Sequence, residues 1–472
     1  MKVEEVKNEF RAVNGQFFPE QMSSRLFMST KDIDNKYLVA FHERFHYLQY
    51  VFTPYGHLKW GANRSFTSEV IETWNNLTTI LKKEKKIPIF EYMIDEDIAS
   101  LKILSTVYFQ DFLKRYSAIT DGVTVSVDDL IFSTTDLENL VPKIIVNKKE
   151  YQLNGLDIIE SFAKFEEALF GYLMENKDIN EIINPDNLPP RYYIALYYFI
   201  DKVGMERLYE FPIACELSLA FSHLPRYNDE QSLYSCHPAW RFLKIIDYLK
   251  NNPELKPDVF SDDSFWRYTQ SVLVGCEFED WSELWKPAEE YAKQTDLTMA
   301  KEMLDAIKYK QKNPWCLSYP TVNLQFFLNA DFERFHPLFI ITDDRVFYNV
   351  ENVSISELLF ENEFQALALQ ICGHISPYNM FYDMLQCGDN YFGVKSCKHW
   401  LDGSCNGHLC KDTELPALEL DENGNVINGC LMEIMLNMFG TSIKEITIGN
   451  MLHKYSLKEI SEAVKLLEKV NK

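Results

Sequence analysis

Residues 36–51 read KYLVAFHERFHYLQYV, an apolar and aromatic segment that carries two histidines and a glutamate. Its apolar residues recur at helical spacing, and Thr30, Asp32 or Asp34 could begin a helix, so the sequence predicts one over 33–52. His42 and His46 are four residues apart, which places both imidazoles on one face of that helix. Two imidazoles held in this way can bind one metal ion.

Glu43 follows the first histidine and completes the pattern His-Glu-x-x-His. A carboxylate at this position can reach a water on the metal, which is the place of the general base in a zinc hydrolase. Zinc lowers the pKa of its bound water to about 7, so hydroxide is available near neutral pH. The motif predicts a zinc-dependent hydrolase that acts on peptide bonds. The alternative is a core helix with hydrogen-bonded histidines, because so short a pattern also arises by chance.

The segment 39–48, VAFHERFHYL, resembles the extended signature of the zincin metallopeptidases in the hydrophobic positions around its histidines. It departs from that signature at Arg44, where family members usually carry an uncharged residue. The chain continues to Gln49 as HExxHxxQ, so it lacks the third histidine of the metzincin pattern HExxHxxGxxH. The resemblance therefore implies a gluzincin-like arrangement, in which a glutamate on a later helix is the third ligand.

Three glutamates are candidates for that third ligand. Glu160 lies in the sequence IESFA (159–163), which resembles the Glu-Gly-Phe-Ala ligand segment of zinc aminopeptidases, and we expect it to be the ligand. Glu216 is the second candidate, because it interrupts an apolar helical stripe. Glu69 follows the motif at a spacing common in gluzincins, but its helical neighbours are polar. A structural role, such as a salt bridge or a helix cap, remains open for Glu160 and Glu216.

These assignments give a catalytic centre in which His42, His46 and Glu160 hold Zn²⁺ and Glu43 is the general base. A further group must stabilise the oxyanion that forms on the substrate. The candidates for this role, which the sequence does not separate, are His57, His223 and a tyrosine.

Composition limits the partners and the location expected of the chain. It has 472 residues, of which 46% are hydrophobic and 14% aromatic, enough for a substantial core. A formal net charge of −23 argues against a nucleic acid or an anionic membrane as partner, since both require basic surface. The N-terminus lacks the apolar core of a secretory signal, and no stretch approaches the roughly 18 apolar residues of a membrane span. We expect a cytoplasmic protein whose partner is a peptide or protein substrate.

A cysteine cluster near the C-terminus predicts a second, structural zinc site. Its members are Cys387, Cys397, Cys405 and Cys410, with His399 and His408 between them. The surrounding residues are rich in Gly, Asp, Asn and Ser, as in a loop wrapped around a metal. The last three cysteines resemble the first three ligands of a CCCH finger, and Cys387, His399 or His408 would supply the fourth. The alternative is a coincidental group of free thiols.

The predicted fold is mainly α, of the α+β class, with a zincin-like HExxH helix in a helical body, small β-hairpins and a Cys-rich C-terminal region. Helical patterns cover 33–52, 66–85, 94–118, 155–176, 190–224, 237–251, 264–274, 281–309, 354–372, 429–439 and 456–470. Hairpins are predicted at 143–153 and 338–349. Pro- and Asn-containing stretches at 250–263 and 311–322 are candidate linkers or exposed loops. We expect a metallopeptidase domain over 1–310 and a C-terminal region over 323–472.

Two other classes of function could use the same residues. The sequence ERFH occurs at 43–46 and again at 333–336. Two E-x-x-H motifs, with Glu160 and Glu216 from other helices, would form the ligand set of a di-iron carboxylate oxidoreductase. Pro337 argues against a helix at the second copy. The other class is a non-catalytic zinc-binding protein, in which Glu43 has no chemical role.

Overall fold

The computed structural model describes residues 15–18, 23–26, 36–61, 141–186, 188–223, 234–258, 261–294, 298–320, 335, 339–342, 346–348, 419–420 and 426–428. These residues are mostly helical, as the sequence predicts. Several predictions fall outside them: Glu69, the cysteine cluster at 387–410, and the helices at 66–85, 94–118, 354–372, 429–439 and 456–470. No helix in the described ranges is both long enough and apolar enough to cross a membrane.

The longer helices are α2 (Lys36–Phe52), α8 (Gly155–Glu175), α10 (Ile194–Val203), α11 (Phe211–Ser218), α13 (Pro238–Asn251), α14 (Asp262–Gly275), α16 (Lys286–Gln294) and α17 (Thr298–Lys312). Shorter helical segments are α9 (Ile179–Ile182), α15 (Trp281–Leu284), η3 (Pro190–Tyr192), η4 (Met205–Glu210) and η5 (Pro314–Cys316). The strands are β1 (Gly15–Phe18), β2 (Ser23–Leu26), β3 (Lys143–Val146), β4 (Lys149–Gln152), β5 (Phe339–Thr342), β6 (Val346–Tyr348), β7 (Glu419–Leu420) and β8 (Val426–Asn428).

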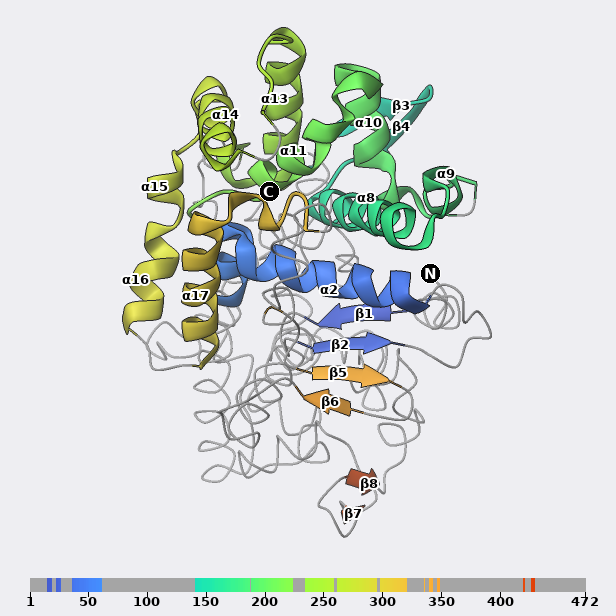
Figure 1. The fold of residues 1–472 in the computed structure, drawn as a ribbon, viewed down its shortest axis with the longest axis vertical. Helices are drawn as coiled ribbons and strands as arrows, with labels where there is room; N and C mark the ends of the chain where they lie inside the picture. The colour runs from blue at the N-terminus through green and yellow to red at the C-terminus, as the bar shows by residue number, and fades with distance from the viewer. Residues whose placement is uncertain are drawn as a thin grey trace, which may run out of the picture.

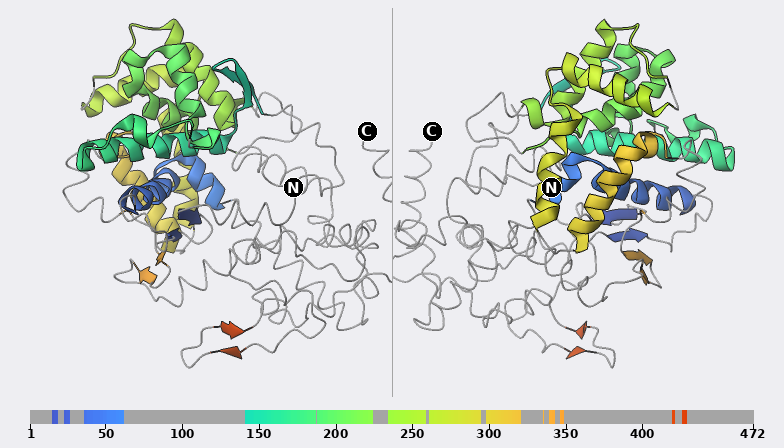
Figure 2. Two further views of the ribbon diagram at one scale, coloured as in Figure 1. Left: turned by 90° about the vertical axis from the view of Figure 1, so that its right-hand side faces the viewer. Right: turned by 60° about the vertical axis from the view of Figure 1, so that its left-hand side comes forward.

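Helix α2 lies between a helical layer and a sheet. It packs on α8 on one side and on β1 and β2 on the other (Figure 1). Figure 2 shows the same order from two further directions, with α8, α10, α13 and α14 on the opposite side of α2 from β1 and β2, and with α17 alongside α2. Phe17 of β1 makes edge-to-face contacts with Tyr47 and Tyr50 of α2. The predicted HExxH helix is therefore the central element of the described fold.

Aromatic side chains set the position of α2 relative to α8. Phe45 packs edge-to-face on Phe162, with ring centroids 4.8 Å apart, and both side chains are fully buried. One helical turn nearer the start of α2, Phe41 stacks on Phe170 at 4.5 Å. Burial of each such ring stabilises the fold by about 1.5–3 kcal/mol. Since the rings come from both helices, they determine which residues of α8 face the histidines of α2.

A capping box begins α8 and thereby determines where its residues point. The side chain of Asn154 accepts a hydrogen bond from the Asp157 amide at 3.1 Å, and Asp157 Oδ2 accepts one from the Asn154 amide at 2.9 Å. Reciprocal capping of this kind satisfies two backbone donors that a helix start otherwise leaves free. The helix ends at Asn176, whose backbone is left-handed. Both ends agree closely with the predicted helix 155–176.

Both predicted hairpins form, and one of them belongs to a larger sheet. Strands β3 and β4 pair around Asn147 and Lys148, which both have positive φ, as a tight two-residue turn requires. Strands β5 and β6 form the second hairpin and extend a four-stranded sheet of order β1-β2-β5-β6, in which β2 and β5 run parallel. The sequence analysis did not predict β1 and β2, because GQFF and SSRL do not alternate between apolar and polar residues.

Two predicted long helices are interrupted, and one predicted loop is buried. The pattern at 190–224 breaks at Gly204, whose φ of 111° lies outside the helical region. The pattern at 281–309 divides into α15, α16 and α17, and Pro287 lies in the first turn of α16, where a proline is tolerated. Residues 314–320 are buried, so this part of the stretch 311–322 is not an exposed loop.

Glu166 of α8 makes the stability of the folded chain depend on pH. Its carboxyl is fully buried and has no hydrogen-bond partner in the described part of the chain. Burial raises the pKa of Glu166 well above its usual value of 4.5, so the folded chain keeps a proton that the unfolded chain loses. Stability therefore falls as the pH rises above about 4.5, by about 1.4 kcal/mol per pH unit until the folded-state pKa is reached.

Glu166→Gln removes this titration, so its gain in unfolding free energy over the wild type should grow between pH 5 and pH 7. Chemical unfolding of both proteins at the two pH values measures the gain. Glu181→Gln, at an exposed carboxyl, is the control and should show the same stability difference at both. A gain for Glu166→Gln that does not depend on pH would contradict the assignment.

Candidate metal centre

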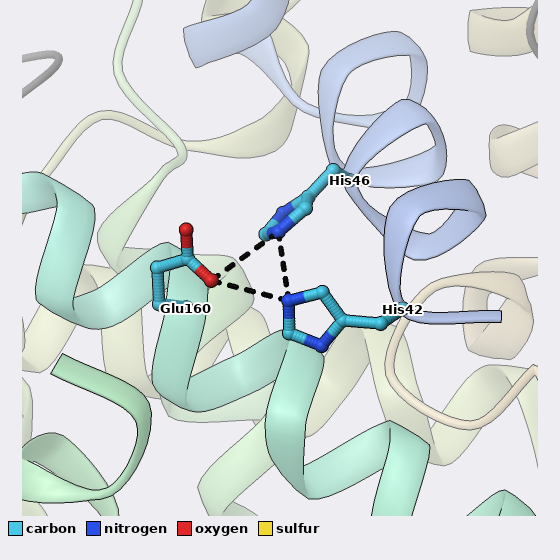
Figure 3. Close-up of side chains that lie close together, drawn as sticks. All are labelled: His42, His46 and Glu160. Atoms are coloured by element: carbon cyan, nitrogen blue, oxygen red, sulfur yellow. Dashed lines mark hydrogen bonds and ion pairs between the residues drawn. The ribbon is translucent and has the colours of Figure 1, made fainter. Parts of the chain in front are cut away.

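His42 and His46 of α2 and Glu160 of α8 point toward one another (Figure 3). The two Nε2 atoms are 3.1 Å apart. Glu160 Oε2 lies 3.1 Å from Nε2 of His42 and 3.4 Å from Nε2 of His46. Among the described residues, this is the group of three possible metal-binding side chains that comes together. The structure therefore brings together the three side chains that the sequence predicts to be metal ligands.

The spacing of these donor atoms fits a zinc ion. Zinc binds nitrogen and oxygen ligands at about 2.0–2.2 Å in tetrahedral array, which puts neighbouring ligand atoms about 3.3 Å apart. The observed separations of 3.1 and 3.4 Å match this value. Among the described residues the cluster has three possible protein ligands, which is the number found in catalytic zinc sites, whereas structural sites have four.

Both histidines have a partner on the nitrogen that faces away from the cluster. Nδ1 of His46 donates to the amide oxygen of Gln49 at 2.8 Å. Oε2 of Glu167 lies 3.0 Å from Nδ1 of His42. The acceptor at Nδ1 of His46 favours the tautomer of this ring whose Nε2 carries a lone pair, which is the form that binds a metal. Once Nε2 of His42 gives up its proton, Nε2 of both histidines and Oε2 of Glu160 would present three lone pairs at short range, an arrangement that a cation between them would stabilise.

Two further contacts hold these partners in place. The amide nitrogen of Gln49 donates to the carbonyl of Ile159 at 3.0 Å, so Gln49 connects α2 to α8 directly beside Glu160. Nζ of Lys164 lies 2.6 Å from the other carboxylate oxygen of Glu167. The ligands therefore belong to a network of polar groups, and both outer partners come from the same two helices.

The electrostatics of the cluster favour positive charge between its members. Burial lowers the pKa of His42, but the hydrogen bonds and charges of Glu160 and Glu167 outweigh it and raise that pKa to about 10. Burial raises the pKa of Glu160, yet His46 and His42 hold it well below its usual range. The pKa of Glu167 is likewise lowered against the effect of burial, chiefly by His42 and Lys164. A divalent cation would take the place of the protons held here.

Glu43 is buried beside the cluster, and Gly15 makes room for it. A Cβ atom at position 15 would lie 2.7 Å from Cγ of Glu43 and 2.9 Å from its Oε1, so no larger residue fits without moving the carboxylate. Burial raises the pKa of Glu43 to about 7, although His42 and His46 lower it. Strand β1 therefore begins against the residue predicted to be the general base.

The ring of Tyr192 of η3 lies beside His42 of the cluster. Its ring centroid lies 5.8 Å from that of His42. Burial and the charges of Glu160 and Glu43 raise the pKa of Tyr192, so the hydroxyl keeps its proton and can donate it in a hydrogen bond. Of the three candidates for oxyanion stabilisation, a tyrosine is the one that the structure brings to the site.

The other candidates lie elsewhere. His57 bonds to the carbonyl of Val51 at 2.8 Å, and His223 lies 3.7 Å from Glu279. Glu216, the second choice for the third ligand, is 2.6 Å from Lys310 in a buried ion pair. The apolar stripe around Glu216 is thus explained by charge pairing, and the structure does not bring this residue to the histidines.

Sequence reasoning missed Glu167, Gly15 and the role of Gln49. A signal existed for two of them. Gln49 is three residues after His46, and Glu167 is seven residues after Glu160, so each lies on the helix face that carries the ligand. Gly15 gave no signal, because its contact with Glu43 depends on how β1 packs on α2.

Comparison of the chain with protein-family models, with curated proteins and with solved structures finds no match. The geometry of the site therefore carries the functional argument.

Glu167 provides a test of the network around the ligands. Because its carboxylate faces Nδ1 of His42, Glu167→Gln removes the charge that favours this imidazole as a ligand. Loss of such an outer partner typically weakens metal binding about 10- to 100-fold. Competition for Zn²⁺ against a chromophoric chelator measures the change, with Glu181→Gln as the exposed control. Equal zinc affinity in the wild type and Glu167→Gln would contradict this role.

Proposed function

We propose that this chain is a zinc-dependent peptidase in which His42, His46 and Glu160 bind the metal and Glu43 is the general base. One observation carries the proposal: three ligand atoms from α2 and α8 converge at 3.1–3.4 Å beside a buried carboxylate. The three ligands are the histidine pair and later glutamate that the resemblance to gluzincins implies.

In the proposed reaction, different side chains would have different roles. When bound, Zn²⁺ would polarise the scissile carbonyl and lower the pKa of a coordinated water to about 7. The Glu43 carboxylate accepts a proton from the attacking water and then delivers it to the nitrogen of the leaving amine as the C–N bond breaks. The Tyr192 hydroxyl donates a hydrogen bond to the substrate oxygen as negative charge develops on it.

Two observations favour a catalytic role over a purely structural zinc site. The described cluster has three ligands, where a structural site needs four. In addition, the carboxylate of Glu43, the residue after His42, is buried in a space that Gly15 keeps for it, and a structural site has no use for this carboxylate. The di-iron alternative loses support, because Glu216 is paired with Lys310 and is not available as a ligand.

Hydrolysis of an unfolded protein such as casein tests the proposal. The chain is purified without chelator, supplied with an equimolar amount of Zn²⁺, and new amino termini are quantified. We expect peptide-bond cleavage that stops with 1,10-phenanthroline and returns when Zn²⁺ is added back. A zinc-loaded, folded protein that cleaves neither casein nor a random peptide library would overturn the proposal, and so would cleavage that the chelator does not affect.

A further inference from the structure

Solvent exposure at the candidate centre increases toward η3. The side chains of His42, His46 and Glu160 are 8%, 11% and 16% exposed, respectively. Tyr192 is half-buried, and its neighbour Arg191 is exposed. Since Tyr192 contacts the His42 ring, the segment that carries Arg191 lies at the border between the ligands and solvent.

Segment η3 is fixed to the helix that carries the third ligand. The hydroxyl of Ser161, next to Glu160 in the chain, donates to the carbonyl of Arg191 at 2.8 Å. The same hydroxyl accepts a hydrogen bond from the Ala195 amide at 3.3 Å. Ser161 is fully buried, so these bonds are shielded from water. The backbone of Arg191 therefore holds a set position relative to the metal ligands.

Among the described residues, the guanidinium of Arg191 has no partner that would give it a role in holding the fold together. In the described part of the chain it makes no hydrogen bond, and no carboxylate lies within ion-pair distance of it. Other arginines there are engaged: Arg207 bonds to Glu210, Arg241 to backbone carbonyls, and Arg267 to the Asp263 carbonyl. Burial raises the pKa of Asp157 to about 6, and the charge of Arg191 acts to lower it.

A guanidinium without a partner in the described part of the chain differs in charge from the groups around it. The chain carries a formal net charge of −23, and Glu43, Glu160 and Glu167 gather at the centre itself. These carboxylates disfavour an anionic group of a substrate. Arg191 offsets that repulsion on the exposed side, and a guanidinium binds a carboxylate through two parallel hydrogen bonds.

We infer that Arg191 is a specificity-determining residue that binds a carboxylate of the peptide substrate near the scissile bond. The carboxylate is either the C-terminal one or that of an acidic side chain. The inference rests on the proposed peptidase function, because it assigns the substrate class of the same site. It predicts a preference for carboxylate-bearing peptides over uncharged ones, despite the acidic character of the chain.

Three matched peptide libraries test the inference and distinguish the two sources of the carboxylate. All share one set of uncharged core sequences: the first ends in an amide, the second in a free carboxylate, and the third carries one internal Glu and ends in an amide. The values of kcat/KM are measured for the zinc-loaded wild type, Arg191→Gln and Arg191→Lys. Arg267→Gln, which removes an exposed arginine of α14, is the control.

In Arg191→Gln, the ratio of kcat/KM for one carboxylate-bearing library to that for the uncharged library should fall about 10- to 100-fold. Arg191→Lys should recover part of this ratio, because it keeps the charge without the planar fork. The library that responds identifies the source of the carboxylate. An unchanged ratio, or an equal loss on all three libraries, would overturn the inference.

Binding to the zinc-loaded Glu43→Gln variant separates this inference from the proposed function. Fluorescence anisotropy of labelled library peptides gives Kd without turnover. Tighter binding of a carboxylate-bearing library that Arg191→Gln abolishes would support the inference even if the wild type cleaves nothing, in which case the peptidase proposal alone fails. If carboxylate-bearing and uncharged peptides bind equally, the inference fails, whether or not the wild type is an active peptidase.

Discussion

The His42→Ala/His46→Ala variant should contain one zinc ion fewer per chain than the wild type. The change removes two of the three converging donors and leaves Glu160 as the remaining ligand of the cluster. A single carboxylate without imidazole partners does not retain zinc through purification, because the affinity of such sites comes from several ligands acting together. Metal analysis by mass spectrometry on protein purified without chelator measures the difference.

His223→Ala is the matched control, because this histidine lies near Glu279 and not at the cluster. Its zinc content should equal that of the wild type. Circular dichroism establishes that the double variant is folded, and Glu160→Gln offers a milder change with an intact helix α2. Equal zinc content in wild type and double variant would mean that the motif is core packing, and the peptidase proposal would be abandoned. Iron near two ions per chain would favour the di-iron class.

The second large effect is expected at Glu43. Glu43→Gln should reduce peptide hydrolysis by about 10²- to 10⁴-fold, because an amide cannot accept the proton that the reaction must move. Glutamine has the same shape as glutamate, so it fits the space beside Gly15 and should leave zinc content unchanged. The casein assay and metal analysis on the same preparation measure both quantities.

Measured together, casein hydrolysis and zinc content distinguish a chemical role of Glu43 from a structural one. Reduced hydrolysis with full zinc content supports the role of Glu43 as a base, while Glu181→Gln, at an exposed carboxyl of α9, should retain wild-type hydrolysis. If Glu43→Gln hydrolyses casein as fast as the wild type, Glu43 is not the base. If neither protein shows activity in any assay, the non-catalytic zinc-binding class gains support.

The sequence predicted the local parts of the site well. Periodicity and the motif predicted α2, the helical pattern at 155–176 predicted α8, and the short segment IESFA indicated Glu160. Each of these signals is formed by residues close together in the chain, so it can be recognised in a single sequence. The assignment of Glu160 in preference to Glu216 is supported by the geometry of the described residues.

Other features depended on contacts between distant segments. The rotation of α8 that brings Glu160 to the histidines comes from pairs such as Phe45–Phe162 and Gln49–Ile159, which no local pattern reveals. The parallel pairing of β2 with β5 joins residues more than three hundred positions apart in the chain. The cysteine cluster at 387–410 and the boundary between the two predicted domain regions stay predictions.

The distance along the chain between the ligands also affects when the site can form. His42 and Glu160 are separated by 118 residues. At about 5–20 residues per second, a ribosome needs about 6–24 s to add that length, so the histidine pair is made well before its carboxylate partner. During that interval a nascent chain offers two imidazoles without Glu160 or Glu167. If the cluster binds a metal as proposed, full metal affinity requires that α8 has been synthesised and has docked on α2.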